Sequence, residues 1–166
     1  MGLCISYPVG DDYKAAWRGA YGAFMTFRTK IAELAGLPPL QLMEGFFEPL
    51  VEGESSLGGG LPTLWHIPTG TKNEYSSAVM RINDLCPVKW ECLKPSVLFL
   101  FLHHSDCKGE IQWECLKEMA DLIEELIPLM PEEDHPGHIG NWAETTQKLV
   151  DGMREAFSLK VNLGFH

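Results

Sequence analysis

The densest group of chemically reactive side chains lies between residues 102 and 116. This segment reads Leu-His-His-Ser-Asp-Cys-Lys-Gly-Glu-Ile-Gln-Trp-Glu-Cys-Leu. Imidazole, thiolate and carboxylate groups are the donors that zinc prefers in proteins. A metal site in this segment would use His104, Asp106, Cys107 and Cys115. The chain contains no CxxC or HxxxH pair that would strengthen this interpretation, so zinc stays an open alternative.

The same segment is a poor match to an EF-hand calcium loop. Asp106 and Gly109 would occupy the third and sixth places of such a loop, but the first, fifth and twelfth places fall on His104, Lys108 and Cys115. Calcium requires hard oxygen ligands there, including a bidentate carboxylate at the end of the loop. We therefore do not expect calcium.

A structural role explains most of these residues without any ligand. Asp106 can accept backbone N–H groups in an Asx-type turn, and Gly109 can supply a positive φ. Cys107 and Cys115 can fill the core as small apolar groups. Catalysis by Cys107 would require a lowered thiol pKa and a positioned base, and its histidine neighbours in the sequence do not by themselves provide either.

The segment also resembles a known family. The motif runs His104-Ser-Asp-Cys107, then Gly109-Glu-Ile111, then Cys115 at the head of an amphipathic helix. It is similar to the HSDC-x-GE[IL]…C helix–loop–helix motif of a family of small bacterial and phage or prophage proteins that have no assigned function. The likeness extends to residues 21–28 and 150–156, but not to residues 40–94. Lys108 stands where that family tends to have an acidic residue, which weakens a metal site at this position. The resemblance implies a phage-associated accessory protein in the host cytoplasm, without implying a chemistry.

Composition limits the classes of function. A formal net charge of −10 over 166 residues disfavours a nucleic-acid-binding protein, because such proteins neutralise phosphates with basic stripes. No apolar run approaches the roughly 20 residues that a membrane helix requires. The N-terminal segment lacks the basic and long apolar regions typical of a signal peptide. Five cysteines, an odd number, indicate reduced thiols in the cytoplasm.

Apolar residues at three- and four-residue spacing predict the helices that must position the reactive segment. The expected helices cover residues 13–35, 75–85, 112–130 and 141–157. Gly36 ends the first of them, and Asn141 with Glu144 forms a capping box at the start of the last. The apolar block 95–102 fits a buried strand or a buried helix equally well.

The remaining segments add little regular structure. Residues 159–165 alternate as a short edge strand does, and residues 41–94 form a less regular, insert-like region. We therefore expect a fold that is mainly α with minor β. It would be a single-domain helical globule over residues 1–166, with a small edge-strand pairing.

The sequence favours a non-enzymatic accessory protein that acts by binding. Its partner would be a host protein, inhibited through the acidic surface, or a small nucleotide-like ligand. The expected ligand contacts are His103, His104, Ser105, Asp106 and Trp113, which combine hydrogen-bonding groups with a ring that can stack on a base. Two alternatives stay open: a metal-dependent or cysteine hydrolase centred on His103–Cys115, and a structural or assembly protein.

Overall fold

The computed structural model describes residues 2–46, 87–105, 108–136 and 139–166 and divides the chain into two compact units. The first unit comprises Met1–Gly36 and Pro95–His166, and the second comprises Leu37–Lys94. The predicted helix at 75–85 and the candidate ligands Asp106 and Cys107 lie outside the described residues. The fold and the sites below belong to the first unit.

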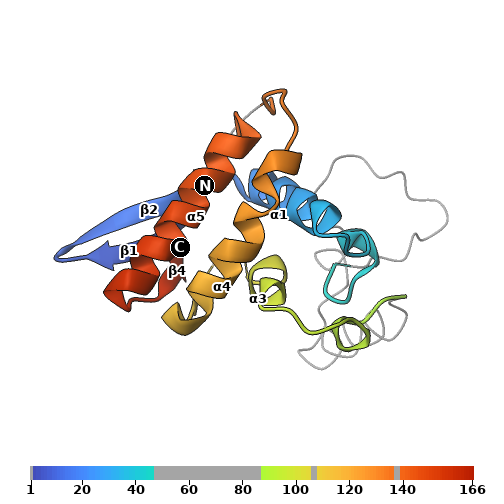
Figure 1. Ribbon diagram of the computed structural model, residues 1–166, viewed down its shortest axis with the longest axis horizontal. Coiled ribbons are helices and arrows are strands. Elements are labelled where there is room, and N and C mark those ends of the chain that lie inside the picture. Colours follow the sequence, from blue (N-terminus) through green and yellow to red (C-terminus); the bar gives the residue numbers. More distant parts are fainter. Residues whose placement is uncertain (1, 47–86, 106–107, 137–138) are drawn as a thin grey trace, which may run out of the picture. The chain divides into compact units, whose positions relative to one another are not determined.

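A four-stranded antiparallel sheet forms one layer of this unit (Figure 1). Strands β1 (Leu3–Val9) and β2 (Asp12–Gly19) make a hairpin whose turn contains Gly10 at a φ of +63°. Strand β4 (Leu163–Phe165) pairs with β1, and β3 (Gly109–Ile111) pairs with β4. The resulting order is β2-β1-β4-β3, with β2 and β3 at the two edges.

The predicted helix over residues 13–35 is wrong in its first third. Residues 12–19 form β2, and helix α1 covers only Tyr21–Leu34, ending as predicted before Gly36, whose φ is +71°. The error has a physical origin. Trp17 precedes Tyr21 by four residues, which is the spacing of one helical turn, but Trp17 belongs to β2 and packs from that strand on the aromatic rings of α1. Its ring lies 5.4 Å from that of Phe24.

The C-terminal tail is also placed differently from the prediction. Its strand β4 is not an edge strand, because it lies between β1 and β3. These pairings join segments more than 50 residues apart in sequence, which local periodicity does not register. The described part of the chain is therefore an α/β fold: the expected combination of helices and strands is present, but the four-stranded sheet is larger than the minor β pairing that was expected.

The described residues hold four α-helices. The apolar block becomes the short helix α3 (Leu98–Leu102). The predicted helix over 112–130 becomes α4 (Trp113–Glu124) followed by a 3-10 turn, η3 (Ile127–Leu129). The last helix, α5 (Trp142–Leu159), begins at the predicted cap, where the Asn141 side chain accepts from the Glu144 N–H at 3.0 Å. None of these helices has the length and apolar character needed to cross a bilayer.

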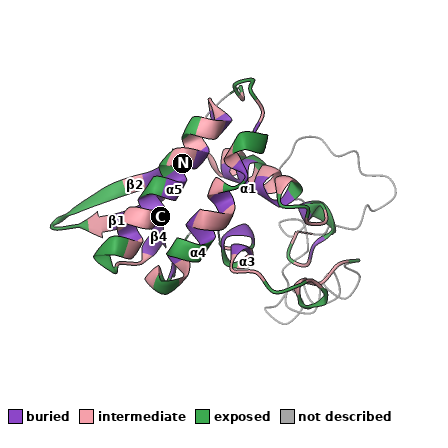
Figure 2. Ribbon diagram, in the orientation of Figure 1, coloured by how far each residue is buried: buried purple, intermediate pink, exposed green. Residues whose placement is uncertain are grey.

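The core lies between the helices and one face of the sheet. Because side chains alternate along a strand, one face carries apolar residues from all four strands, Leu3, Ile5, Tyr7, Trp17, Ile111, Leu163 and Phe165, all of them buried. Phe24 of α1 packs on this face, with ring centroids 5.6 Å from Phe101 and 6.0 Å from Phe165. Figure 2 shows buried residues where the strands pass the helices and exposed residues at the hairpin tip.

Two further contacts hold α5 in place. Gly152 packs against β2 so closely that a Cβ atom at this position would lie 2.4 Å from the Ala16 Cβ. On the other side of the helix, Arg154 donates to Glu124 at 2.6 Å and to Asp121 at 2.9 Å, which ties α5 to α4. The Arg154 guanidinium lowers the pKa of Glu124, and Lys117 and then Arg154 lower the pKa of Asp121.

Replacing Gly152 with alanine should destabilise the protein by about 1–3 kcal/mol, because the added methyl forces α5 away from β2. Alanine at Gly22 is the matched control, since it is a helical glycine with open space at its Cβ position. Gly22→Ala should stabilise the protein by about 0.4–1 kcal/mol. Urea unfolding of both variants measures the difference. Equal effects of the two substitutions would contradict the described approach of α5 to β2.

Replacing Arg154 with methionine should reduce stability at pH 7, and the loss should shrink as the solution becomes acidic. A carboxyl with a lowered pKa in the folded state stabilises that state above its ordinary pKa, and the stabilisation disappears as the pH falls through the folded-state pKa. The ordinary values are 3.8 for Asp121 and 4.5 for Glu124. The difference in unfolding free energy between wild type and variant should therefore be largest at pH 7, begin to fall near pH 4.5, and be smallest below pH 3. A difference that stays constant from pH 7 to pH 3 would exclude this ion pair as its cause.

Candidate functional site

The predicted ligand residues do not converge on one site. His103 is the exposed residue that follows α3, and Ser105 is exposed. His104 is half-buried and lies on the helix-covered side of the sheet, where its ring stacks on Phe165 at 3.8 Å. Trp113 begins α4 and lines a pocket on a different face of the sheet. Of the predicted contacts that the structure describes, only Trp113 lines this pocket.

His104 acts as a packing residue in this arrangement. Its Nδ1 lies 2.8 Å from the Ser105 carbonyl oxygen, and its own carbonyl oxygen accepts from the buried Arg28 guanidinium at 2.9 Å. Gly109 has a φ of +123°, as predicted, and a Cβ there would lie 2.9 Å from the His104 ring. The histidine, the arginine and the glycine therefore fix the chain beside β3.

The metal hypothesis gains no support from the described residues. Within these residues, no group of three or more His, Cys, Asp or Glu side chains could hold a metal ion. Cys115 is half-buried on α4, and His104 stacks on Phe165. Because Asp106 and Cys107 lie outside the described residues, the four-residue metal site stays a prediction.

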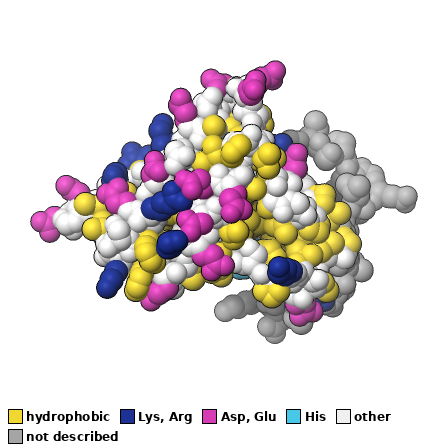
Figure 3. Space-filling view, in the orientation of Figure 1, with side chains coloured by type: hydrophobic (Ala, Val, Ile, Leu, Met, Phe, Trp, Pro, Cys, Tyr) yellow, Lys and Arg dark blue, Asp and Glu magenta, His cyan; other side chains and the backbone are white. Residues whose placement is uncertain are grey.

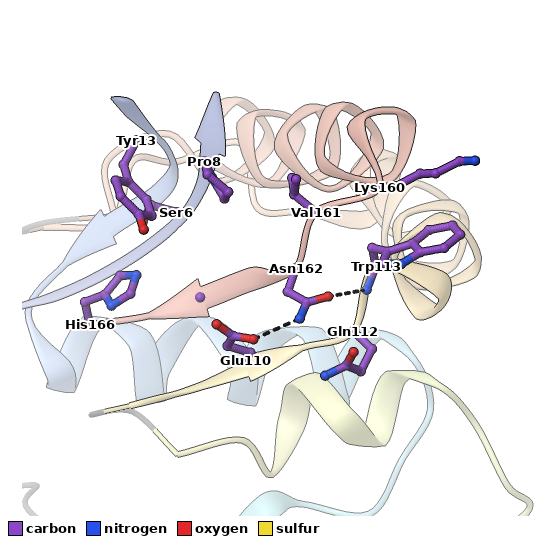
Figure 4. A pocket seen from close by; sticks show the side chains of 11 residues that line it. Ser6, Pro8, Tyr13, Glu110, Gln112, Trp113, Lys160, Val161, Asn162 and His166 are labelled. Carbon is purple, nitrogen blue, oxygen red and sulfur yellow. Dashed lines mark hydrogen bonds between the residues drawn. The ribbon is translucent and has the colours of Figure 1, made fainter. Parts of the chain in front are cut away.

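The other face of the sheet carries a pocket of about 490 Å³. The strand register places alternate residues of each strand on this face, opposite the core. The lining residues follow this alternation and are completed by the segment that leads from α5 into β4: Ser6, Pro8, Tyr13, Glu110, Gln112, Trp113, Lys160, Val161, Asn162, Gly164 and His166. Figure 4 shows these side chains around β4.

A chain of hydrogen bonds fixes the polar side of the pocket. Asn162 donates its side-chain amide to Glu110 Oε2 at 2.8 Å and accepts from the Trp113 backbone N–H at 3.1 Å (Figure 4). The first N–H groups of a helix have no partner within the helix. Asn162 satisfies one of them at α4, where the side chain of the residue at the capping position, Gln112, makes no capping hydrogen bond. The Glu110 carboxylate is thereby held beside the start of α4, where the helix dipole favours negative charge.

Aromatic rings form the apolar surfaces of the pocket. The rings of Tyr13 and His166 meet edge to face with centroids 6.1 Å apart. Gly164 lies beneath them, and a Cβ there would be 2.8 Å from His166 Nε2. At the other end, the Trp113 ring is supported by Phe157 at 5.8 Å. A flat ligand can stack on such rings while its edge meets the polar groups.

The pocket contains the residue types of a hydrolytic triad without the geometry of one. Ser6, His166 and Glu110 line the same space. A serine nucleophile needs a hydrogen bond to its histidine, and the histidine needs an orienting carboxylate. No hydrogen bond joins Ser6 to His166 among the described residues, and Glu110 accepts from Asn162 instead. The arrangement suits binding better than acyl transfer.

Sequence reasoning missed most of this pocket. The sequence predicts a ligand contact at Trp113, but it places Tyr13 in a helix, gives Glu110 only a place in the motif, and predicts no ligand contact at Asn162 or His166. The usable signal is the spacing of Asn162, Gly164 and His166, since residues two apart share one face of a strand. Which other residues join them depends on the pairing of β4 with β1 and β3.

Replacing Asn162 with alanine should destabilise the protein by about 1 kcal/mol, because α4 loses the acceptor for its first N–H group. Gln112→Ala is the control, since Gln112 lines the same pocket but makes no capping bond, and it should change stability by less than about 0.5 kcal/mol. Thermal and urea unfolding give both values. A neutral Asn162→Ala variant would refute the capping role.

Comparison with known proteins returns no relative for this chain. No family model matches it, and neither a curated protein nor a solved structure matches it significantly. The resemblance to a phage protein family therefore stays a prediction.

Proposed function

We propose that this chain is a non-enzymatic binding protein whose ligand is a small, flat, polar molecule of the nucleoside type. The observation that supports this proposal is the bonded chain Glu110–Asn162–Trp113 beside stacking rings in a pocket of about 490 Å³. Ligand pockets commonly have volumes of about 300–1,000 Å³ and combine apolar surfaces with a few fixed polar groups. The pocket on the open face of the sheet has these properties.

The polar groups favour a ligand edge that donates hydrogen bonds. An ionised carboxylate only accepts hydrogen bonds, so Glu110 would bind the amino or imino edge of a base or a sugar hydroxyl. Lys160 lies at the end of α5 and supplies a single cation on the opposite side. One lysine beside one carboxylate does not suit a polyphosphate, because like charges repel across an interface. The proposed ligand class, nucleosides without a polyphosphate, is therefore narrower than the nucleotide-like class expected from the sequence.

The other functions considered for the chain receive less support. A serine hydrolase would require the missing bond between Ser6 and His166. The hydrolase centred on His103–Cys115 and the structural or assembly role stay predictions, as does inhibition of a host protein. A phage-associated accessory role is compatible with the proposed ligand binding, but the pocket neither supports nor opposes it.

Titration of the protein with adenosine, guanosine, cytidine and uridine, followed by calorimetry, tests the proposal. At least one nucleoside should bind, and its triphosphate should bind more weakly because of Glu110. Glu110→Gln keeps an acceptor for Asn162 but removes the charge, and it should weaken binding by about tenfold, or about 1.4 kcal/mol.

Glu114→Gln is the matched control, because Glu114 is an exposed residue in the first turn of α4 that does not line the pocket. It should leave the affinity unchanged. Binding of none of the four nucleosides, or equal effects of the two substitutions, would refute the proposed ligand class. Release of a hydrolysed product would refute the non-enzymatic role.

A further inference from the structure

We propose that a second groove, between β2 and α5, binds an acidic peptide segment in extended conformation, which adds to the free edge of β2 as a further strand. The groove has a volume of about 550 Å³ and is separate from the pocket on the open face of the sheet. One wall is the strand segment from Lys14 to Arg18. The other is a stripe of α5 with residues at the three- and four-residue spacing of one helix face, Thr145, Lys148, Asp151, Gly152 and Glu155.

The backbone of β2 is available for pairing. In the sheet order β2-β1-β4-β3, β2 has β1 as its single neighbour. Within the described residues, no backbone group of 12–19 bonds to anything except β1. An edge strand of this kind presents a row of free N–H and C=O groups, and peptides bind to such edges by adding a strand. At about 3.3 Å per residue, Lys14 to Arg18 offers an edge of about 13 Å.

The floor of the groove allows another backbone to approach. Ala15, Ala16 and Gly152 line it with the smallest side chains. Because Gly152 contacts Ala16 directly, no long side chain lies between β2 and α5 at this point to block an approaching backbone. The buried Trp17 indole also lines the groove, and its N–H has no partner among the described residues.

The charges of the groove favour an acidic occupant. At one end, Lys14 forms an ion pair with Glu155 next to Tyr7. Lys14 and then Tyr7 lower the pKa of Glu155, while burial and then Glu155 raise the pKa of the Tyr7 hydroxyl. This end is therefore neutralised internally.

At the other end, Arg18 and Lys148 are exposed and have no acidic partner within the part of the chain that the structure describes. Asp151, the remaining acidic residue, accepts from Gln147. The groove thus keeps a net positive charge in a chain whose formal net charge is −10. Figure 3 shows Lys and Arg side chains along the margin of β2, whereas acidic and basic groups are interleaved over α4 and α5.

A second copy of the chain fits this edge less well than an acidic peptide does. Pairing of two β2 strands would bring the unpaired cations Arg18 and Lys148 of both copies to one interface. Like charges repel across an interface. The glutamate or aspartate side chains of a peptide would instead be attracted by these two cations.

Fluorescence anisotropy with the full chain tests the proposal. The probe is a fluorescein-labelled hexapeptide of alternating valine and glutamate, and the comparison is the same peptide with lysine in place of glutamate. The glutamate peptide should bind and the lysine peptide should not. Arg18→Glu and Lys148→Glu should each weaken binding by about tenfold. Hydrogen exchange should show new protection of amides 14–18 and no change at 109–111, the opposite edge.

Lys108→Glu is the matched control, because Lys108 is exposed beside β3 and the substitution changes the net charge by the same two units. It should leave the affinity for the glutamate peptide unchanged. Three results would overturn the proposal: no binding of the glutamate peptide, an equal loss with Lys108→Glu, or binding without protection of β2. Self-association through β2 in the absence of peptide would also overturn it, because the occupant would then be a second copy.

Discussion

The first unit depends on the three residues of β4. This strand pairs with β1 on one side and with β3 on the other, so it unites segments from the beginning, the later part and the end of the described chain. Phe165 projects from it into the core, where it contacts Phe24 and His104. Gly164 projects to the other face, where it makes room for the His166 ring. One short strand therefore organises both the packing and the pocket.

The two faces of the sheet differ because alternation assigns their residues to different environments. On the covered face, apolar side chains lose contact with water, which contributes roughly 25 cal/mol for each Å² buried. On the open face, Glu110 and Asn162 can stay polar because each has a bonded partner or contact with solvent. Asn162 serves both the packing and the pocket: its side-chain oxygen accepts from the first N–H group of α4, and its side-chain amide holds the Glu110 carboxylate beside the pocket. The stability of α4 and the geometry of the pocket are therefore coupled at this residue.

The sequence predicts local structure here better than it predicts pairing. The start of α5 at Asn141, the end of α1 before Gly36 and the positive φ of Gly109 follow from side-chain or backbone chemistry within a few residues, and all three are confirmed. The strand β2 was missed because Trp17 fits a helical pattern that begins in the next element. The pocket was missed because its members come from four separate segments. Its composition follows only from the register of the sheet, which no local pattern contains.

The contact between Gly152 and Ala16 explains why β2 keeps a free edge. Because both residues are small, α5 can lie directly on the covered face of β2. A helix in that position buries the face of the strand but does not reach around it, so the outer N–H and C=O groups have no partner among the described residues. Unprotected edges promote association, and natural proteins often place charged residues along them. Arg18 on β2 fits this pattern, since it is exposed, has no acidic partner among the described residues and would oppose self-pairing.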